Sequence, residues 1–204
     1  MSDFGLDRFR PTHIVRSFEG VTPEALQAAG LGEVNVVISD SDGTTTSHHA
    51  EFVEPRVYNT FAKLTEAGIW LCIESNAYND RLSVLRNMYE TSDLGMRVVT
   101  PIDVAHGRNP KRVRKPSKDM TEHILDLAAE RFQAPASAVM VGDQMMKDIW
   151  SANRAEIPSI LVPRRGEGDD KNVRRFQRPV ERWMRHQLDL PIEYEDYPES
   201  LTAV

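Results

Sequence analysis

Two carboxylates one residue apart follow a short apolar segment of the chain. Asp40 and Asp42 come directly after the largely β-branched residues 34–39, and Gly43 and Thr44 follow them. Because two such charges on a tight loop repel each other, the arrangement usually requires a cation or a shared proton. One interpretation is a hard-metal site in which one carboxylate attacks phosphorus and the other works as acid and base. The alternative is an Asp/Gly turn that joins two elements.

A hydroxyl, an amide and a lysine come further along the chain. Ser75 and Asn76 follow the second apolar segment, residues 69–74, where their polar groups could hold an anion. Ser-Asn is also ordinary turn or helix-capping chemistry. Lys115 could neutralise a bound phosphoryl group together with the attacking carboxylate. Its alternative interpretation is a solvated cation in a basic run.

A second acidic pair follows the apolar segment 138–141. Gly142 lets the backbone turn sharply there, and Asp143 and Asp148 can both point back toward Asp40 from the start of the next helix. Carboxylates near a helix N-terminus also suit its dipole, so helix capping is the alternative. The combination of acidic pair, hydroxyl, lysine and second acidic pair is much stronger evidence for a site than any of its parts.

Strand-like and helix-like segments alternate along the chain. The apolar patterns predict strands over 34–39, 69–74, 96–100, 138–141 and 158–162, and helices over 55–67, 79–90, 117–132 and 145–154. Ser117 is expected to cap the third of these helices. This order predicts a three-layer α/β/α sandwich with a mostly parallel sheet. Ligands bind at the carboxyl ends of the strands in such folds, and each candidate residue comes at or just beyond a predicted strand end.

In this order the candidate residues resemble the four motifs of the haloacid dehalogenase (HAD) superfamily. Those motifs are an Asp-x-Asp-x-Thr loop, a Ser or Thr after a strand, a Lys, and an acidic pair such as Gly-Asp-x-x-x-x-Asp. Their matches here are, in turn, Asp40/Asp42/Thr44, Ser75, Lys115, and Gly142-Asp143 with Asp148. The resemblance implies a Rossmannoid, HAD-like fold and a phosphoric monoester hydrolase with Mg²⁺ as its cofactor.

The resemblance also implies the roles of the acidic residues. Asp40 is the nucleophile that takes the phosphoryl group as an aspartyl-phosphate, and it also binds Mg²⁺. Asp42 protonates the leaving oxygen, then activates the hydrolytic water, and contacts the metal through its backbone carbonyl. Asp143 completes the metal site, and Asp148 helps to hold that site in place.

On the phosphate side, the resemblance implies that Ser75 and Asn76 hold the phosphoryl oxygens while Lys115 offsets their charge. The sequence separations add a further expectation. The 35 residues from Asp40 to Ser75 and the 40 from Ser75 to Lys115 leave no room for a separate cap domain. An uncapped site suits a bulky substrate, or one that a partner presents.

Shorter matches point to a group within the superfamily. The chain is similar to the YqeG-like, subclass IIIA phosphatases over roughly residues 8–165, at Arg10-Pro11-Thr12-His13, Ser75-Asn76 with Arg81, Lys115-Pro116, and Gly142-Asp143-Gln144 through Asn153-Arg154-Ala155. That group includes phosphatidylglycerophosphate phosphatases, so the resemblance implies this lipid as the first substrate to test. A soluble sugar or nucleotide phosphate and a nucleic-acid end phosphate stay open. From another class, the alternative is a non-catalytic binding or scaffold protein on a HAD fold, which has no physical reason to keep the catalytic set together.

The net charge of −6 is the sum of unlike regions of the 204-residue chain. Residues 189–204 hold five acids and no Lys or Arg, whereas residues 108–118 hold six Lys or Arg and no acid. The total charge argues against a dedicated nucleic-acid binder. Beside Lys115, however, the charge is positive, as a phosphorylated substrate requires, and it could also draw in an anionic membrane surface.

A composition with 40% hydrophobic and 27% charged residues is typical of a folded, water-soluble protein. The lone Cys72 excludes an internal disulfide, and no apolar run is long enough to span a membrane. We therefore expect a cytoplasmic protein whose membrane contact, if any, is peripheral. No pattern in the sequence selects an oligomeric state.

Four parts of the chain are expected. Residues 1–30 form an N-terminal extension that packs on a catalytic core at 31–165, residues 166–188 form an amphipathic, Arg-rich helical segment, and residues 189–204 form a loosely held acidic tail. The helical segment packs its apolar residues on the protein itself or on a second subunit, or it lies on a membrane interface. These apolar residues are Val173, Phe176, Val180, Trp183, Met184 and Leu188.

Overall fold

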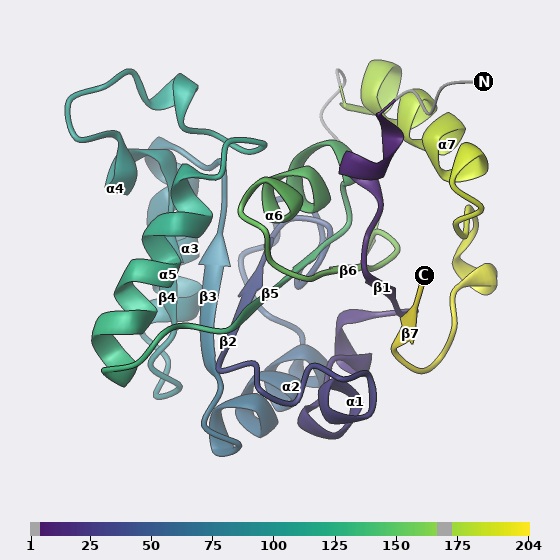
Figure 1. Cartoon of the computed structure of the whole chain (residues 1–204). Coiled ribbons are helices and arrows are strands. Elements are labelled where there is room, and N and C mark those ends of the chain that lie inside the picture. The colour runs from purple at the N-terminus through teal and green to yellow at the C-terminus, as the bar shows by residue number, and fades with distance from the viewer. Residues whose placement is uncertain (1–4, 167–172) are drawn as a thin grey trace.

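Seven strands form one sheet in the computed structural model, which describes residues 5–166 and 173–204 (Figure 1). The strand order is β4-β3-β2-β5-β6-β1-β7. Five strands coincide with predicted segments: β2 Val36–Ser39, β3 Trp70–Glu74, β4 Arg97–Val99, β5 Ala138–Gly142 and β6 Ser159–Leu161. They run parallel, as their continuous apolar character predicts for strands covered on both faces.

Two short strands at one side of the sheet are not predicted by the sequence. β1 His13–Ile14 pairs in parallel with β6, and β7 Thr202–Ala203 pairs antiparallel with β1. Two residues are too few to show a period. The expectation of a loosely held tail over 189–204 is wrong, because β7 is paired and the side chains of Leu190 and Tyr197 are buried. These apolar side chains anchor the segment despite its acidic composition.

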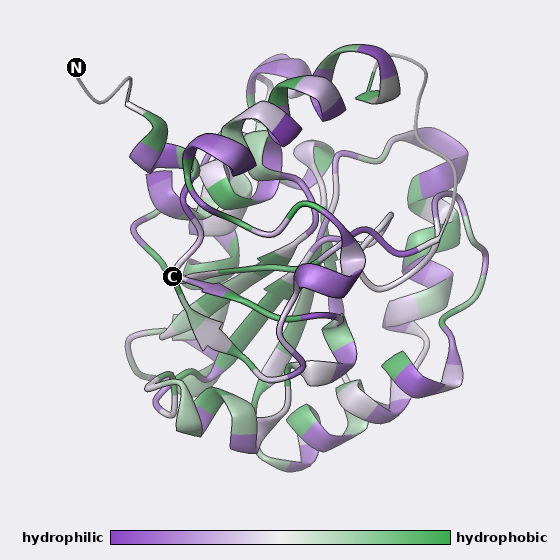
Figure 2. Ribbon diagram, turned by 90° about the vertical axis from the view of Figure 1, so that its right-hand side faces the viewer, coloured by the Kyte–Doolittle hydropathy of each residue, from purple (hydrophilic) through white to green (hydrophobic). Residues whose placement is uncertain are grey.

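Helices cover both faces of the sheet (Figure 1). One layer consists of α1 Pro23–Ala28, α2 Pro55–Glu66 and α3 Asn79–Glu90, and the other consists of α4 Pro101–Ala105, α5 Asp119–Phe132 and α6 Trp150–Arg154. Val37 packs with the first layer and its neighbour Ile38 with the second, because successive strand residues point to opposite faces. Figure 2 shows the hydrophobic strands enclosed between helices of mixed hydropathy. The predicted three-layer α/β/α sandwich is confirmed.

The helix starts refine two predictions. Lys118 is the residue before the first turn of α5, so the predicted cap at Ser117 is one residue early. The backbone N–H of Ser117 donates to the carbonyl of Arg114 at 2.7 Å, which keeps Ser117 in the preceding turn. The helix predicted over 145–154 begins with a wider π-helical turn at Met145–Ile149 and continues as α6.

No domain is inserted between β2 and β5, since residues 40–137 are all described and contain only α2 to α5, β3, β4 and a short 3₁₀ turn at Pro110–Arg112. The predicted absence of a cap domain is thus confirmed for this part of the chain. Within the described ranges, no helix combines the length and the apolar character that crossing a membrane requires.

The C-terminal helix α7 Arg178–Gln187 follows a π-helical turn over Val173–Gln177. The apolar residues of this segment divide between two sides. Val173, Met184 and Leu188 are buried, whereas Phe176, Val180 and Trp183 are 60%, 43% and 51% exposed. The helix therefore packs one apolar stripe on the protein and leaves a second stripe uncovered. Residues 167–172 of the predicted helical segment and residues 1–4 of the predicted extension lie outside the described residues.

Candidate active site

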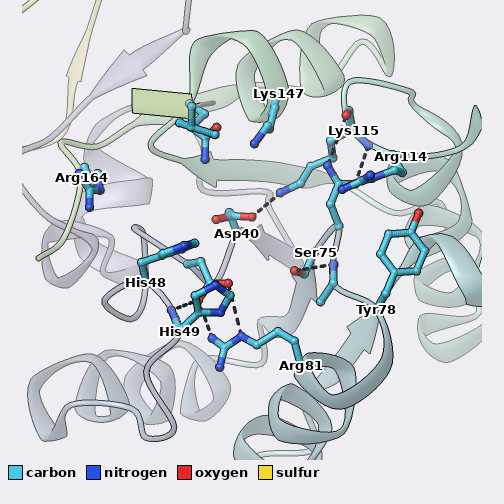
Figure 3. A pocket seen from close by; sticks show the side chains of 15 residues that line it. Asp40, His48, His49, Ser75, Tyr78, Arg81, Arg114, Lys115, Lys147 and Arg164 are labelled. Atoms are coloured by element: carbon cyan, nitrogen blue, oxygen red, sulfur yellow. Dashed lines mark hydrogen bonds and ion pairs between the residues drawn. The ribbon is translucent and has the colours of Figure 1, made fainter. Parts of the chain in front are cut away.

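The central strands end beside one another, and the predicted site residues follow those ends. Asp40 follows β2, Ser75 follows β3 and Asp143 follows β5, in a sheet where β3, β2 and β5 are neighbours. Lys115 reaches the same place from the loop before α5 (Figure 3). Five predicted residues line one pocket: Asp40, Asp42, Ser75, Asn76 and Lys115. Segments far apart in the sequence thus meet at the carboxyl edge of the sheet, as the alternation of strands and helices predicts.

The ammonium group of Lys115 is the centre of the hydrogen-bond network. Its Nζ donates to Oδ1 of Asp40 at 2.5 Å, to Oδ1 of Asp148 at 2.7 Å and to the carbonyl of Glu74 at 2.8 Å. The side chain is only 1% exposed. Burial by itself lowers the pKa of Lys115, but the carboxylates of Asp148 and Asp40 outweigh it, and the net shift is upward. Lys115 is therefore a fixed, charged group and not a solvated member of the basic run.

Three carboxylates share this buried space. Asp40, Asp143 and Asp148 each place one carboxylate oxygen so that the three atoms lie within 4.8 Å of one another. Burial raises the pKa of Asp40, although Lys115 opposes the rise, and the neighbouring carboxylates add to it. Such a cluster is costly without a further cation, and hard divalent cations prefer oxygen ligands of this kind. The donor set therefore fits a divalent metal ion.

Two glycines allow the acidic side chains to approach the loops. A Cβ atom on Gly142 would lie 2.3 Å from Cβ of Asp148, far inside van der Waals contact. Gly43 has a φ of +93°, and a Cβ atom there would lie 3.0 Å from Oδ2 of Asp143. With Gly142 in place, Oδ2 of Asp148 accepts a hydrogen bond from the backbone N–H of Gln144 at 3.0 Å. Both oxygens of Asp148 are thus engaged, one by the loop and one by the lysine.

The side chain of Asn76 holds the backbone of Lys115. Its Oδ1 accepts from the Lys115 N–H at 2.9 Å, and its Nδ2 donates to the Lys115 carbonyl at 3.3 Å. The backbone N–H of Asn76 donates to no acceptor among the described residues. Ser75 uses its Oγ as an acceptor for the N–H of Ala77 at 3.3 Å, which leaves its hydroxyl proton for another acceptor. This edge of the pocket thus offers a hydroxyl and a backbone N–H to an anion.

Asp42 is held from the first layer of helices. Nη2 of Arg81, near the start of α3 (Figure 3), donates to Oδ1 of Asp42 at 2.5 Å, and Nη1 donates to the carbonyl of Ala50 at 2.6 Å. In the sequence Arg81 was notable only as part of a resemblance, and its role could not be read from spacing. The structure makes it the partner of the predicted acid and base.

Three residues of α7 also reach the site and were not predicted. Nη2 of Arg178 lies 2.6 Å from Oδ2 of Asp143, and Arg185 donates to the carbonyl of Asp143 at 3.3 Å. Glu181 accepts a hydrogen bond from the N–H of Met146 at 3.0 Å. The arginines of this segment were expected on a polar face, but Arg185 and Glu181 are buried. Their helical spacing from the buried apolar residues of α7 was the available signal.

Comparison with known proteins points in the same direction as this geometry. Residues 112–186 match the HAD-hydrolase-like family model. Over 175 residues, the chain is 26% identical to the probable phosphatase YqeG of Bacillus subtilis (strain 168). The aligned residues cover 85% of this chain and 88% of that protein.

Fold, site and sequence matches together support a phosphatase of the HAD superfamily. Within that superfamily the chain is similar to YqeG.

Proposed function

We propose that this phosphatase hydrolyses phosphomonoesters with Mg²⁺ and through an aspartyl-phosphate on Asp40. The environment of Asp40 carries the proposal. Lys115 holds Oδ1 of Asp40 at 2.5 Å, whereas no described residue donates a hydrogen bond to Oδ2. Since Asp40 lines the pocket, Oδ2 is the oxygen available to attack a phosphorus atom there.

The reaction then takes two steps. In the first, a bond forms between Oδ2 of Asp40 and phosphorus, the bond from phosphorus to the leaving oxygen breaks, and Asp42 gives its proton to that oxygen. In the second, the ionised Asp42 takes a proton from a water molecule whose oxygen attacks phosphorus. The bond from phosphorus to Oδ2 breaks, inorganic phosphate leaves, and both carboxyl groups return to their starting states.

The phosphoryl group needs positive charge and hydrogen-bond donors, because phosphoryl transfer depends mainly on positioning and electrostatic stabilisation. Lys115 supplies a buried positive charge next to Oδ1 of Asp40. The hydroxyl of Ser75 and the backbone N–H of Asn76 would donate to the phosphoryl oxygens. The amide side chain of Asn76 acts indirectly, since its two hydrogen bonds fix the backbone of Lys115.

A magnesium ion would be held by the carboxylates of Asp40 and Asp143 and by the backbone carbonyl of Asp42, with Asp148 holding the arrangement in place. When bound, it supplies positive charge beside the phosphoryl oxygens. The buried cluster of three carboxylates supports this part of the proposal.

We further propose that the substrate is lipid-borne, with phosphatidylglycerophosphate as the first candidate, and that the protein contacts the membrane peripherally from the cytoplasm. No inserted domain covers the pocket between β2 and β5. Phe176, Val180 and Trp183 form an exposed stripe at helical spacing, beside the exposed Arg175 and Arg182. An apolar stripe flanked by arginines is typical of a helix that lies on an anionic membrane surface.

The reaction class is tested with an aryl phosphate in the presence of Mg²⁺. We expect hydrolysis that EDTA abolishes, that Mg²⁺ restores, and that Asp40→Asn eliminates. Asp80→Asn, an exposed carboxylate at the start of α3, is the matched control and should retain the wild-type rate. Equal rates for wild type and Asp40→Asn would exclude Asp40 as the nucleophile. A folded wild type with no phosphatase activity would favour a scaffold protein instead.

The substrate is tested by comparing lipid, sugar and nucleotide phosphates at equal concentration. We expect the highest kcat/KM on phosphatidylglycerophosphate in vesicles. The double variant Val180→Ser with Trp183→Ser should lower activity on vesicles and leave activity on the aryl phosphate unchanged, since both side chains are exposed and outside the pocket. A soluble sugar or nucleotide phosphate with a higher kcat/KM than the lipid would overturn the lipid proposal and leave the reaction class intact.

A further inference from the structure

A second groove opens beside the catalytic pocket. The two cavities share Asn76, Arg114, Lys115, Lys147 and Val173 as lining residues. The catalytic pocket has a volume of about 240 Å³, which is below the usual range for small-molecule sites, whereas the groove has about 790 Å³. A substrate whose phosphoryl group lies at Asp40 therefore extends beyond the pocket, and the groove is the adjoining space.

The groove is lined by positive charge from three separate segments. Besides Lys115, its cations are Lys111, Arg112 and Arg114 from the loop before α5, Lys147 from the π-helical turn, and Arg154 from the end of α6. None of the described residues that line it is acidic. Like charges brought together in this way raise the free energy of the folded protein, and a bound anion lowers it.

The loop that carries three of these cations is fixed by its own contacts. Val113 is 1% exposed, so it anchors the chain between two outward-facing arginines. Oδ1 of Asn109 accepts a hydrogen bond from the N–H of Lys111 at 3.0 Å. Nη1 of Arg108 pairs with Oδ1 of Asp119 at 3.0 Å, which ties the loop to the start of α5. The positive charges are therefore presented on a defined backbone.

Apart from Lys115, the cations of the groove differ from their neighbours in having no acidic partner among the described residues. Nearby, Lys118 pairs with Glu122 at 2.7 Å. By contrast, the five cations of the groove other than Lys115 make no ion pair with any residue in the described ranges. The guanidinium of Arg114 lies over the ring of Tyr78 at 5.0 Å, a contact that orients the charge without neutralising it.

We propose that this groove binds a second anionic group of the substrate, a phosphodiester or a second phosphate, while the scissile phosphoryl group lies at Asp40. The proposal rests on the phosphatase reaction proposed above and adds the substrate class. It assigns Lys111, Arg112 and Arg154 to recognition of that second group, because they line the groove and not the catalytic pocket. The enzyme should therefore prefer phosphomonoesters that carry a second phosphate over those that carry one.

The test uses the triple variant Lys111→Gln, Arg112→Gln, Arg154→Gln, whose three side chains are exposed and so should not affect folding. Its substrates are glycerol phosphate with one phosphate, glycerophosphoglycerol phosphate with a monoester and a diester, and phosphatidylglycerophosphate in vesicles. We expect kcat/KM to fall about tenfold or more on both substrates with two phosphates, and by less than about twofold on glycerol phosphate. The control variant Lys63→Gln, Arg131→Gln removes two exposed cations that line neither cavity and should match wild type.

Three other outcomes would overturn the proposal. Equal losses on all substrates would mean that the groove cations act on the scissile phosphate. A loss on vesicles alone would mean that they contact the bilayer surface. No loss on any substrate would mean that the groove binds no part of the substrate.

A binding measurement separates the groove from the chemistry. In the Asp40→Asn background, which removes the proposed nucleophile, calorimetry should show that the groove variant binds glycerophosphoglycerol phosphate about tenfold more weakly and glycerol phosphate about equally well. That result would support the groove even if Asp40 is not the nucleophile. Equal affinities in the presence and absence of the groove cations would refute the groove even if hydrolysis is confirmed.

Discussion

The guanidinium of Arg81 binds both oxygens of the Asp42 carboxylate, with Nη2 2.5 Å from Oδ1 and Nε 3.4 Å from Oδ2. The backbone N–H of His49 donates to the same Oδ1 at 3.0 Å. Three donors on one carboxylate fix its direction. In the proposed first step Asp42 gives a proton to the leaving oxygen, so the contact between Asp42 and Arg81 must loosen for that step.

Replacing Arg81 is therefore expected to slow catalysis through the position of Asp42. Arg81→Gln should lower kcat/KM by about 10- to 100-fold, since a misplaced acid and base group loses much of its contribution. The loss should be greater on an alkyl phosphate than on an aryl phosphate, whose leaving oxygen needs less help from a proton. Arg86→Gln is the matched control, because Arg86 lies on the same helix and pairs with Asp103 at 2.6 Å. Equal losses on both substrates would argue against a role through Asp42.

Gly142 is expected to be irreplaceable even by alanine. A Cβ atom at this position would lie 2.3 Å from Cβ of Asp148, and neither atom belongs to a flexible chain end. Gly142→Ala should therefore displace Asp148, lower the free energy of unfolding by about 1–3 kcal/mol and reduce activity sharply. Gly32→Ala is the control, since the nearest atoms to its Cβ lie at 3.5 Å or beyond. Urea unfolding and the aryl phosphate assay measure both effects, and an active, stable Gly142→Ala would contradict the geometry.

Magnesium is expected to stabilise the folded protein. Three buried carboxylates lie close together, and an ion that binds only the folded state raises the free energy of unfolding by about 2.7 kcal/mol at 100 times its Kd. Thermal unfolding should shift upward with MgCl₂ and not with NaCl of equal ionic strength. Asp143→Asn should lose most of this shift, whereas Asp126→Asn, an exposed residue of α5, should keep it. An identical shift in both variants would place the ion elsewhere.

Glu74, the last residue of β3, has a buried carboxyl group. The sequence patterns did not identify this residue. The hydroxyl of Thr121 donates to Oε2 of Glu74 at 2.8 Å. Oγ1 of Thr121 also lies 3.2 Å from Oγ of Ser151, whose hydroxyl donates to the carbonyl of Ser117 at 2.9 Å. Oε1 of Glu74 has no hydrogen-bond partner among the described residues, as suits a neutral carboxyl group better than an ion. Burial raises the pKa of Glu74 to about 7, although Lys115 opposes the rise.

Glu74 should make stability depend on pH. Between its ordinary pKa of 4.5 and about 7, the folded protein keeps a proton that the unfolded chain has lost. Its stabilising contribution is therefore complete below the lower value and is lost as pH rises through the upper one, by about 3 kcal/mol in all. Glu74→Gln cannot titrate, so its stability relative to wild type should rise by about 2–3 kcal/mol between about pH 5 and pH 8.

Urea unfolding in EDTA measures this difference. Glu66→Gln, on the surface of α2, is the control and should show no such change with pH. The proposed ionisation of Glu74 would be refuted by a stability difference between wild type and Glu74→Gln that is the same at both pH values.

Much of the candidate site at the carboxyl edge of the sheet could be predicted, because the sequence patterns that indicate it are local. Asp40, Ser75 and Asp143 each follow an apolar segment, and parallel strands bring such ends together whatever the details of packing. Their order along the chain, Asp40, Ser75, Lys115 and Asp143, therefore predicted that these side chains lie close together. The short strands β1 and β7 could not be predicted in this way, because two residues carry no period and the pairing of these strands is decided by contacts between segments distant in sequence.

The sequence by itself determined the alternation of strands and helices, the lack of a cap domain between β2 and β5, and the residues that surround the pocket. Only the tertiary structure decided which charges face each other: Arg81 with Asp42, and Arg178 with Asp143. It also decided that the cations beside Lys115 line a groove in which none of the described lining residues is acidic. The physical reason is that helical and strand periods are local properties of the chain. The partner of a long charged side chain, in contrast, depends on how elements distant in sequence pack.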